Sequence, residues 1–182
     1  MKTFLLALVA VVMTAGTAFA QQEPGKLKLG AGLAYGTEAG LDEDGGKGGL
    51  GIYVGGEYFF TEKISAAPSF TYFFKSKADF YGAEISGQAS TLDIDGRYYF
   101  ASTETVSFYG MAGLSVAFAK VEFDGEDSWG ASDSASDNKA GVNVGAGLVY
   151  PLTETLDLNA QIKYNTPLEQ LAIQIGIAFP IN

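Results

Sequence analysis

The clearest alternation of hydrophobic and polar residues lies near the carboxyl end, over residues 155–165, TLDLNAQIKYN. From Leu156 to Asn165 apolar and polar side chains alternate without interruption. A period of two indicates a β-strand with one apolar and one polar face. In a soluble β-protein the apolar face covers a core, whereas in a transmembrane barrel it faces lipid and the polar face lines the lumen.

Similar alternation recurs along the chain, and no segment has a helical period. Gly, Pro and polar clusters separate the alternating segments. Eight strands are predicted, at residues 26–37, 49–61, 63–75, 83–101, 105–123, 140–152, 156–165 and 168–181. In the fourth, the pattern over residues 85–89 is out of phase with the end of the strand, which predicts a β-bulge at that place.

The connections between these strands alternate in length. Those after the second, fourth and sixth strands are tight, at residues 61–63, 102–104 and 153–154. Those after the first, third and fifth are longer and hydrophilic, as at residues 38–49 and 124–139. The tight connection at residues 165–167 is the exception. Short turns at one end and long loops at the other are typical of outer-membrane barrels, whose turns face the periplasm.

Two features favour an apolar face that looks outward. The polar faces are rich in small residues, and the chain has 24 Gly; the interior of an eight-stranded barrel is narrow and has room mainly for small side chains. Aromatic residues of the apolar faces gather at the strand ends, as in the girdles of membrane barrels. Near the turns these are Tyr58, Phe60, Tyr98, Phe100, Phe108, Tyr150 and Phe179, and near the loops Tyr35, Tyr72, Phe74, Phe118 and Tyr164. The pattern therefore predicts an all-β fold, an eight-stranded antiparallel up-and-down transmembrane β-barrel.

The predicted lumen faces carry charges of both signs. They are Lys28, Glu57, Asp93, Asp95, Arg97, Asp157 and Lys163. Inside a barrel these charges are expected to pair across the lumen, because an unpaired charge away from water is energetically expensive. Glu57 and Arg97 lie at similar distances from a short turn, so we expect them to form an ion pair.

The amino-terminal segment predicts export from the cytoplasm. Lys2 is followed by the apolar run 4–13, and Ala18-Phe19-Ala20 has the small-x-small pattern of a signal-peptidase site. A helix of ten residues is too short to cross a bilayer about 30 Å thick, which disfavours an anchor. We therefore expect residues 1–20 to be a cleaved signal peptide and residues 21–182 to form the barrel domain.

Composition excludes several functions. A net charge of −10 disfavours nucleic-acid binding, which needs clustered Lys and Arg. The chain has no Cys and no His, which removes thiolate metal sites and the usual catalytic base near neutral pH. Asp93 and Asp95 are a candidate carboxylate pair, although paired interior charges are the favoured interpretation. The run 42–45, DEDG, resembles only part of a calcium loop. The sequence thus predicts no enzyme, cofactor or metal site.

With this pattern the predicted mature chain resembles the small eight-stranded outer-membrane barrels of the OmpX and OmpA-transmembrane-domain type. In the carboxyl-terminal QIGIAFPI, the residues Gln174, Gly176, Phe179 and Ile181 look like the signal that the barrel assembly machinery reads in such proteins. Departures from it are Ile181, where an aromatic residue is usual, and the additional Asn182. The resemblance implies a monomer in the outer membrane of a Gram-negative-type cell, in contact with lipid, lipopolysaccharide and the assembly machinery.

Three functions fit this fold. The favoured one is a non-enzymatic barrel with a structural or surface-interaction role through its long acidic outer loops. In one of them Trp129 either anchors an extracellular ligand or folds back onto the barrel rim. A narrow porin-like channel for ions or small solutes is the alternative, and an interior filled by side chains argues against high conductance. A secreted soluble barrel that carries a hydrophobic ligand is disfavoured by the small-residue faces.

Overall fold

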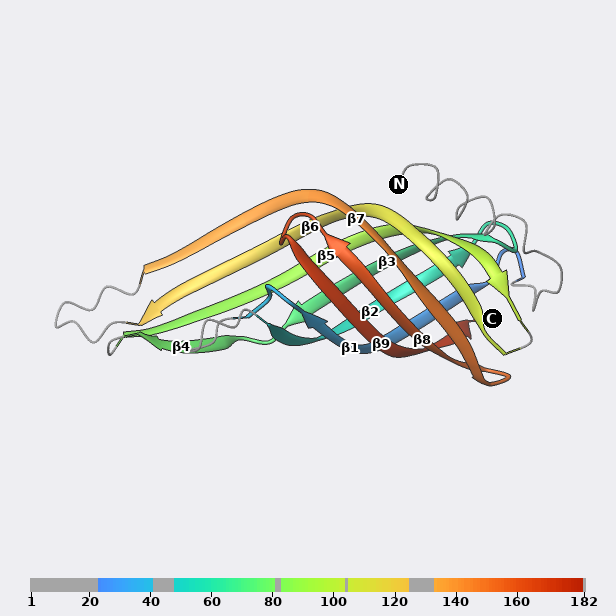
Figure 1. Ribbon diagram of the computed structural model, residues 1–182, viewed down its shortest axis with the longest axis horizontal. Coiled ribbons are helices and arrows are strands. Elements are labelled where there is room, and N and C mark those ends of the chain that lie inside the picture. The colour runs from blue at the N-terminus through green and yellow to red at the C-terminus, as the bar shows by residue number, and fades with distance from the viewer. Residues whose placement is uncertain (1–22, 41–47, 81–82, 104, 125–132, 182) are drawn as a thin grey trace, which may run out of the picture.

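The computed structural model shows an elongated sheet that curls into a tube (Figure 1) and describes residues 23–40, 48–80, 83–103, 105–124 and 133–181. All regular elements in these ranges are strands, and no helix there is long and apolar enough to cross a membrane. The strands are β1 (Leu27–Gly36), β2 (Gly49–Phe59), β3 (Ile64–Phe73), β4 (Ser76–Phe80), β5 (Ala83–Ser102), β6 (Ser107–Asp124), β7 (Asp133–Thr153), β8 (Leu156–Asn165) and β9 (Gln170–Ile181).

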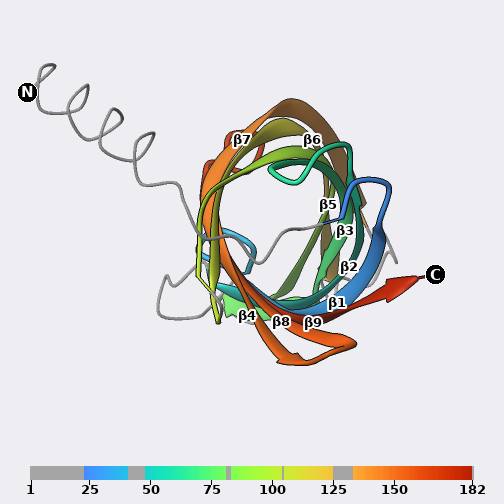
Figure 2. The same cartoon turned by 90° about the vertical axis from the view of Figure 1, so that its right-hand side faces the viewer.

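The sheet is closed. Each strand pairs antiparallel with its neighbours in the order β3-β2-β1-β9-β8-β7-β6-β5-β4, and a further pairing joins β3 to β5. Because β3 and β4 both pair with β5 and follow one another in the chain, they are two pieces of one interrupted strand. The view along the tube in Figure 2 shows the resulting ring. The predicted eight-stranded antiparallel barrel is therefore confirmed.

The apolar faces look outward along every strand. Ile175 is 53% exposed whereas its neighbour Gln174 is 1% exposed, and Ile162 and Lys163 of the opening stretch differ in the same way. Large exposed apolar side chains continue round the barrel, with Leu33, Leu50, Val54, Ile94, Leu114 and Val144 each more than half exposed. An apolar surface of this extent is not tolerated in water, but it suits a lipid environment. The barrel surface therefore contradicts the soluble-carrier alternative.

Aromatic side chains lie on this outer face at both ends of the strands. Near the turn that joins β2 and β3, the rings of Tyr58 and Phe60 meet edge to face with centroids 5.1 Å apart. Towards the outer end of the same region, Tyr72 and Phe74 have centroids 6.2 Å apart. Such rings suit the membrane interface, where an apolar body and a polar tip are both solvated.

Two stretches predicted as loops are strands instead. Residues 76–80 form β4, and residues 133–139 belong to β7. The central strands are accordingly long, with 20 residues in β5, 18 in β6 and 21 in β7, against 10 in β1 and in β8. Polar composition suggested loops, but backbone pairing with a neighbouring strand does not require apolar side chains. In Figure 1 these strands extend beyond the rest of the barrel, towards the end that carries the long loops.

The predicted bulge of the fourth strand lies on its neighbour. Along β5 the register with β6 is continuous from Glu84 to Tyr99. On the other side, Tyr72 pairs with Ser90 and Ser76 with Gly87, so three residues between β3 and β4 face two of β5. The β5–β6 register itself shifts between Tyr99 and Ala101, at the turn end of β5 and away from residues 85–89.

Three sequence predictions lie outside the described residues. These are the signal peptide of residues 1–20, the acidic run 42–45 and Trp129. They remain predictions from the sequence.

The outward-facing apolar surface predicts that a charge placed in contact with lipid lowers the stability of the folded protein. Ile175 lies at the middle of β9, so Ile175→Arg should destabilise the folded protein in bilayers by ~2–4 kcal/mol. Leu171→Arg, at the outer end of the same strand, should cost only about 0–1 kcal/mol. Reversible urea unfolding in phospholipid vesicles measures both. Equal costs at the two positions would contradict a membrane-spanning β9.

Candidate functional site

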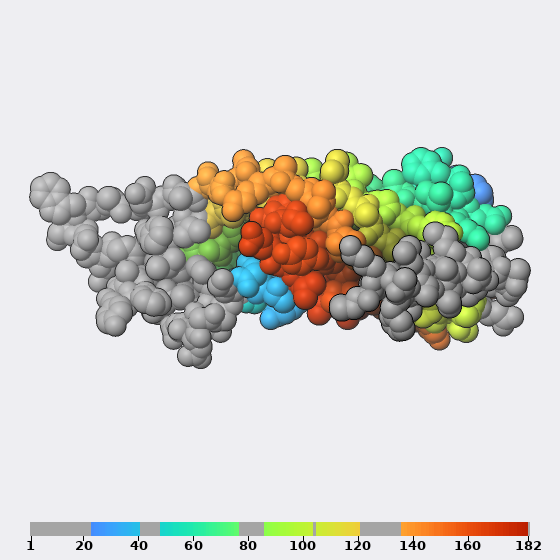
Figure 3. Space-filling model, turned by 45° about the horizontal axis from the view of Figure 1, so that its top comes forward, coloured from blue at the N-terminus to red at the C-terminus, as the bar shows by residue number. Residues whose placement is uncertain are grey.

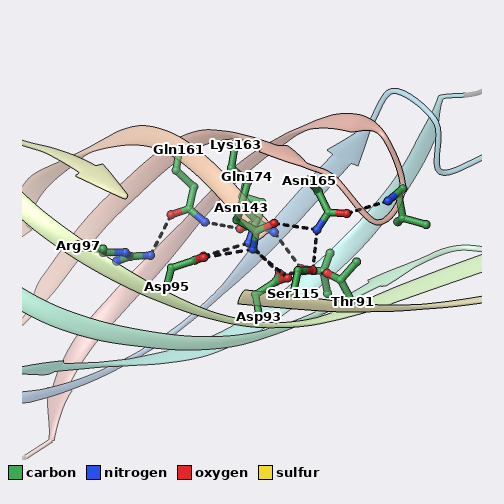
Figure 4. Close-up of polar contacts among 12 residues, drawn as sticks. Thr91, Asp93, Asp95, Arg97, Ser115, Asn143, Gln161, Lys163, Asn165 and Gln174 are labelled. Atoms are coloured by element: carbon green, nitrogen blue, oxygen red, sulfur yellow. Dashed lines mark hydrogen bonds and ion pairs between the residues drawn. The ribbon is translucent and has the colours of Figure 1, made fainter. Parts of the chain in front are cut away.

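Polar side chains from several strands contact one another inside the barrel (Figure 4). All seven charged residues predicted for the lumen point inward, and six of them are less than a tenth exposed. Every one of the seven takes part in an ion pair with another of the set. The pairs fall into three groups.

The first pair joins the beginnings of two non-adjacent strands. Lys28 of β1 donates a hydrogen bond from Nζ to Asp157 Oδ2 of β8 over 2.8 Å. The strand β9 lies between β1 and β8. The Lys28–Asp157 contact therefore passes over the lumen face of β9, near the short turns.

The second group centres on Arg97 of β5. Its Nη1 donates to Glu57 Oε2 of β2 over 2.8 Å, and its Nη2 donates to Gln161 Oε1 of β8 over 2.9 Å. The same Glu57 accepts bonds at Oε1 from Ser65 Oγ over 2.5 Å and from Tyr99 OH over 2.8 Å. One guanidinium thus ties three strands from different sides of the barrel, with its charge compensated by a fully engaged carboxylate.

The third group holds two carboxylates against one ammonium. Lys163 Nζ of β8 lies 2.8 Å from Asp93 Oδ2 and 3.3 Å from Asp95 Oδ2, both on β5. Asn143 Nδ2 of β7 donates to Oδ1 of both aspartates over 3.1 Å, and Thr91 Oγ1 donates to Asp93 over 3.1 Å. All of these side chains are buried. Both carboxylates are therefore engaged in ion pairs with Lys163 and in hydrogen bonds from Asn143.

Side-chain amides connect the charged groups, and sequence reasoning did not single them out. Gln161 Nε2 of β8 donates to Gln174 Oε1 of β9, and Gln174 Nε2 donates across the lumen to Thr71 Oγ1 of β3 over 2.9 Å. Nearer the outer end, Asn165 Nδ2 donates to Ser115 Oγ over 2.7 Å and to Asn143 Oδ1 over 2.8 Å. The sequence pattern that could have predicted these contacts is the row of amides on the polar face of β8, at Asn159, Gln161 and Asn165.

Large aromatic side chains share the interior with these polar groups, which differs from the expectation of mainly small residues. Phe59, Tyr99, Tyr109, Met111 and Val149 form a buried cluster near the short turns. The Arg97 guanidinium stacks 4.7 Å from the centroid of the Tyr109 ring, a cation–π contact. A Cβ at Gly147 would meet that same ring. The missing side chain of a wall glycine is therefore what makes room for Tyr109.

The outer end of the interior is covered by a small apolar cluster. Ala34, Ala39, Phe73 and Ala89 are buried there, with Leu168 packed against them. Nearer the short turns, the cavity between Lys28, Tyr53, Glu57 and Arg97 has a volume of about 30 Å³, enough for only a few water molecules. Buried atoms without a hydrogen-bond partner are few among the described side chains, namely Arg97 Nε and Gln170 Oε1.

In the described part of the chain no group of three or more acidic, His or Cys side chains is placed to hold a metal ion. Each carboxylate of these groups lies against one of the cations Lys28, Arg97 and Lys163, and Asp93 and Asp95 share Lys163. What the arrangement does is hold strands together and occupy the lumen.

The four residues of the expected assembly signal divide between the two faces of β9. Gln174 points into the lumen, whereas Phe179 and Ile181 point outward and are 46% and 40% exposed. Gly176 faces inward against β1, where a Cβ would meet the backbone of Ala31 and the Tyr53 hydroxyl. Ile181 pairs with Leu27 at the start of β1, which places this segment at the seam where the barrel closes.

A closed sheet with an apolar outer belt and a paired polar interior defines an integral membrane β-barrel. Residues 4–177 match the protein-family model of the outer membrane protein beta-barrel domain. The chain therefore belongs to this family, and it is an outer-membrane protein.

Solved structures share the fold at low sequence identity. The attachment invasion locus protein Ail of Yersinia pestis is 20% identical, with a TM-score of 0.58 over 87% of this chain and 100% of that one. The N-terminal β-barrel domain of Pseudomonas aeruginosa OprF is 19% identical, with a TM-score of 0.57 over 88% and 100%. A major outer membrane protein of Thermus thermophilus is 15% identical, with a TM-score of 0.63 over 86% and 98%. No curated protein matches the chain.

The Glu57–Arg97 pair predicts strong energetic coupling. Arg97→Gln should cost about 3–5 kcal/mol of folding free energy in bilayers, because Glu57 is left as a buried unpaired charge. Adding Glu57→Gln should recover part of that loss, with a coupling of roughly 0.5–3 kcal/mol. Urea unfolding of the two single variants and the double variant closes the cycle. Strictly additive costs would show that the pair contributes nothing to stability.

Proposed function

We propose that the protein is a non-enzymatic outer-membrane barrel whose lumen is closed and whose activity lies in surface interactions outside the membrane. The observation that carries this proposal is the extension of the sheet beyond the barrel. It comprises β4, residues 83–88 of β5, residues 120–124 of β6 and residues 133–140 of β7, and is called the outer sheet extension below.

The paired interior argues for this role over the alternative of a narrow channel. Arg97 bridges Glu57 and Gln161 across the lumen, and the aromatic cluster surrounds the same level. An ion passing this level would have to displace hydrogen bonds between charged groups, which are stronger than those between neutral groups. A permanently open pore does not fit this geometry.

The outer sheet extension argues for a role in contacts with other surfaces. Strands longer than the membrane requires add nothing to the spanning of lipid, but β7, with 21 residues, extends past the end of its neighbour β8, with 10 residues. The space-filling view in Figure 3 shows β7 in orange along the barrel. The chain has 21 acidic against 11 basic residues. We infer a cationic partner, such as a basic protein surface, because complementary charge steers association.

This expected ligand differs from that of one structural neighbour. Ail of Yersinia pestis was solved in complex with the heparin analogue sucrose octasulfate, a polyanion, and is 19% identical to this chain in that structure. A net charge of −10 disfavours such a ligand here. Similarity of fold at this identity does not carry the ligand across.

The remaining expectations belong to the same proposal. Residues 1–20 direct export and are removed, and the carboxyl-terminal strand with Gln174, Gly176, Phe179 and Ile181 is read by the barrel assembly machinery. In the membrane the protein is a monomer in contact with lipid and lipopolysaccharide. Trp129 and the acids of the long loops contribute to extracellular contacts.

A closed lumen predicts that the protein does not conduct ions. Inserted into planar bilayers, the protein should give no current above that of lipid alone. A variant with Tyr99→Ala and Tyr109→Ala should conduct, because the two rings contact each other inside the barrel and Tyr109 stacks on Arg97. Stepwise currents from the unmodified protein, as large as those of the variant, would favour the channel.

The surface role predicts that the acidic outer connection binds cations. Lys120 and Ser136 are paired across β6 and β7, so an Asn-Gly turn can replace residues 121–135 between them. This removes Glu122, Asp124, Glu126, Asp127 and Asp133. Vesicles with the full protein should adhere to polylysine-coated beads more than vesicles with the shortened variant, and neither should adhere to heparin beads. Equal adhesion of both would contradict a role for this connection.

A further inference from the structure

One edge of the outer sheet extension is open. Along β7, pairing with β6 runs to the outer end of the strand, at Asp133. Pairing with β8 begins only at Asn143. In the turn after β8, Thr166 exchanges hydrogen bonds with the backbone N–H and C=O of Val142. Residues 133–140 therefore have no strand on their second side within the described chain. In Figure 1 the outer part of β7, in orange at the left, is the uppermost strand of the sheet. Free N–H and C=O groups at such an edge are a template for pairing with another strand.

Two opposite charges lie on this open edge. Residues 136–140 are all exposed, with Asp137 69% and Lys139 65% exposed at their side chains. Across the sheet, Asp137 faces Ala119 and Lys139 faces Ala117, so neither has a charged partner directly opposite on β6. They lie on the same face, two residues apart, with Lys139 Nζ 3.8 Å from Asp137 Oδ2.

The edge is complementary to itself. If a second copy pairs antiparallel with Asn138 opposite Asn138, then Asp137 of each copy lies directly opposite Lys139 of the other. Both contacts fall on one face and produce a square of alternating charges. Directly opposite pairs of unlike charge stabilise antiparallel strands, and like pairs destabilise them. A two-fold axis through Asn138 makes this contact isologous, so it closes as a dimer.

The direction of β7 decides where the second copy must be. Two copies in one membrane are related by an axis along the membrane normal, so neighbouring β7 strands would run parallel and place Asp137 beside Asp137. Copies in two facing membranes are related by an axis between the membranes, which makes the strands antiparallel and brings unlike charges together. The charge pattern thus favours copies on opposed surfaces.

We propose that the open edge of β7 joins two copies of this chain on facing membranes, by antiparallel strand pairing centred on Asn138. This inference rests on the proposed surface-interaction role and specifies a partner for it. The contact is held by backbone hydrogen bonds and selected by the Asp137–Lys139 pairs.

The test uses the full protein in phosphatidylcholine vesicles that carry one of two dyes, with clustering followed by light scattering and by contact between dyes. Vesicles with the unmodified protein should cluster. Asp137→Lys alone and Lys139→Asp alone should each lower clustering to the level of protein-free vesicles, because each places two like-charged pairs in the contact. Asp137→Lys reduces the net negative charge of −10, so general repulsion between vesicles cannot explain its loss.

Two rescues are expected. Vesicles with Asp137→Lys should cluster with vesicles with Lys139→Asp, although neither clusters with itself. The double variant, with both changes in one chain, should cluster as the unmodified protein does. Clustering by the single variants, failure of either rescue, or no clustering by the unmodified protein would overturn the proposal.

Adhesion to polylysine beads separates this failure from that of the proposed function. Residues 136–140 are retained when 121–135 are replaced, so the two tests use different parts of the extension. If vesicles adhere to polylysine through the acidic connection but do not cluster, only the self-pairing is wrong. If adhesion also fails, the proposed surface role fails with it.

Discussion

Lipid offers no hydrogen-bond partners to the backbone, and the closed ring of strands satisfies this constraint. Within hydrocarbon every N–H and C=O must be paired inside the protein, so a sheet that spans a membrane must have no edge. The β1–β9 and β3–β5 pairings remove the edges. Once the ring is closed, strict alternation divides each strand into a lipid face and an interior face, which is why Ile175 and Gln174 differ so strongly in exposure.

Closure also creates the interior network. In a narrow tube, side chains from strands that never pair are brought within hydrogen-bond distance, as Arg97 of β5 is to Glu57 of β2 and Gln161 of β8. Charges are tolerated there because each lies against an opposite charge, and Glu57, Arg97, Asp93 and Asp95 have further hydrogen bonds. Aromatic rings fit because glycines of the wall, such as Gly147, leave space for them. The outcome is an interior in which charged, amide and aromatic side chains contact one another.

Outside the membrane the constraint is relaxed, and the fold changes accordingly. Water can satisfy backbone groups, so β7 can continue past its neighbour β8 and leave an edge open. Polar sequences such as residues 133–140 form strands there without an apolar face. The same sheet is therefore closed where lipid surrounds it and has an open edge on β7 beyond that region.

The sequence by itself determined the eight spanning strands and the direction of their faces, because the period of two is a local property that lipid imposes on every spanning strand. It also supplied the inward charges, including Glu57 and Arg97, from their parity. Only the tertiary structure decided which charges meet, that Tyr109 stacks on Arg97 while Tyr99 donates to Glu57, and that β4 and the outer part of β7 are strands. Those outcomes depend on register and curvature between segments distant in the chain, and no local pattern encodes them.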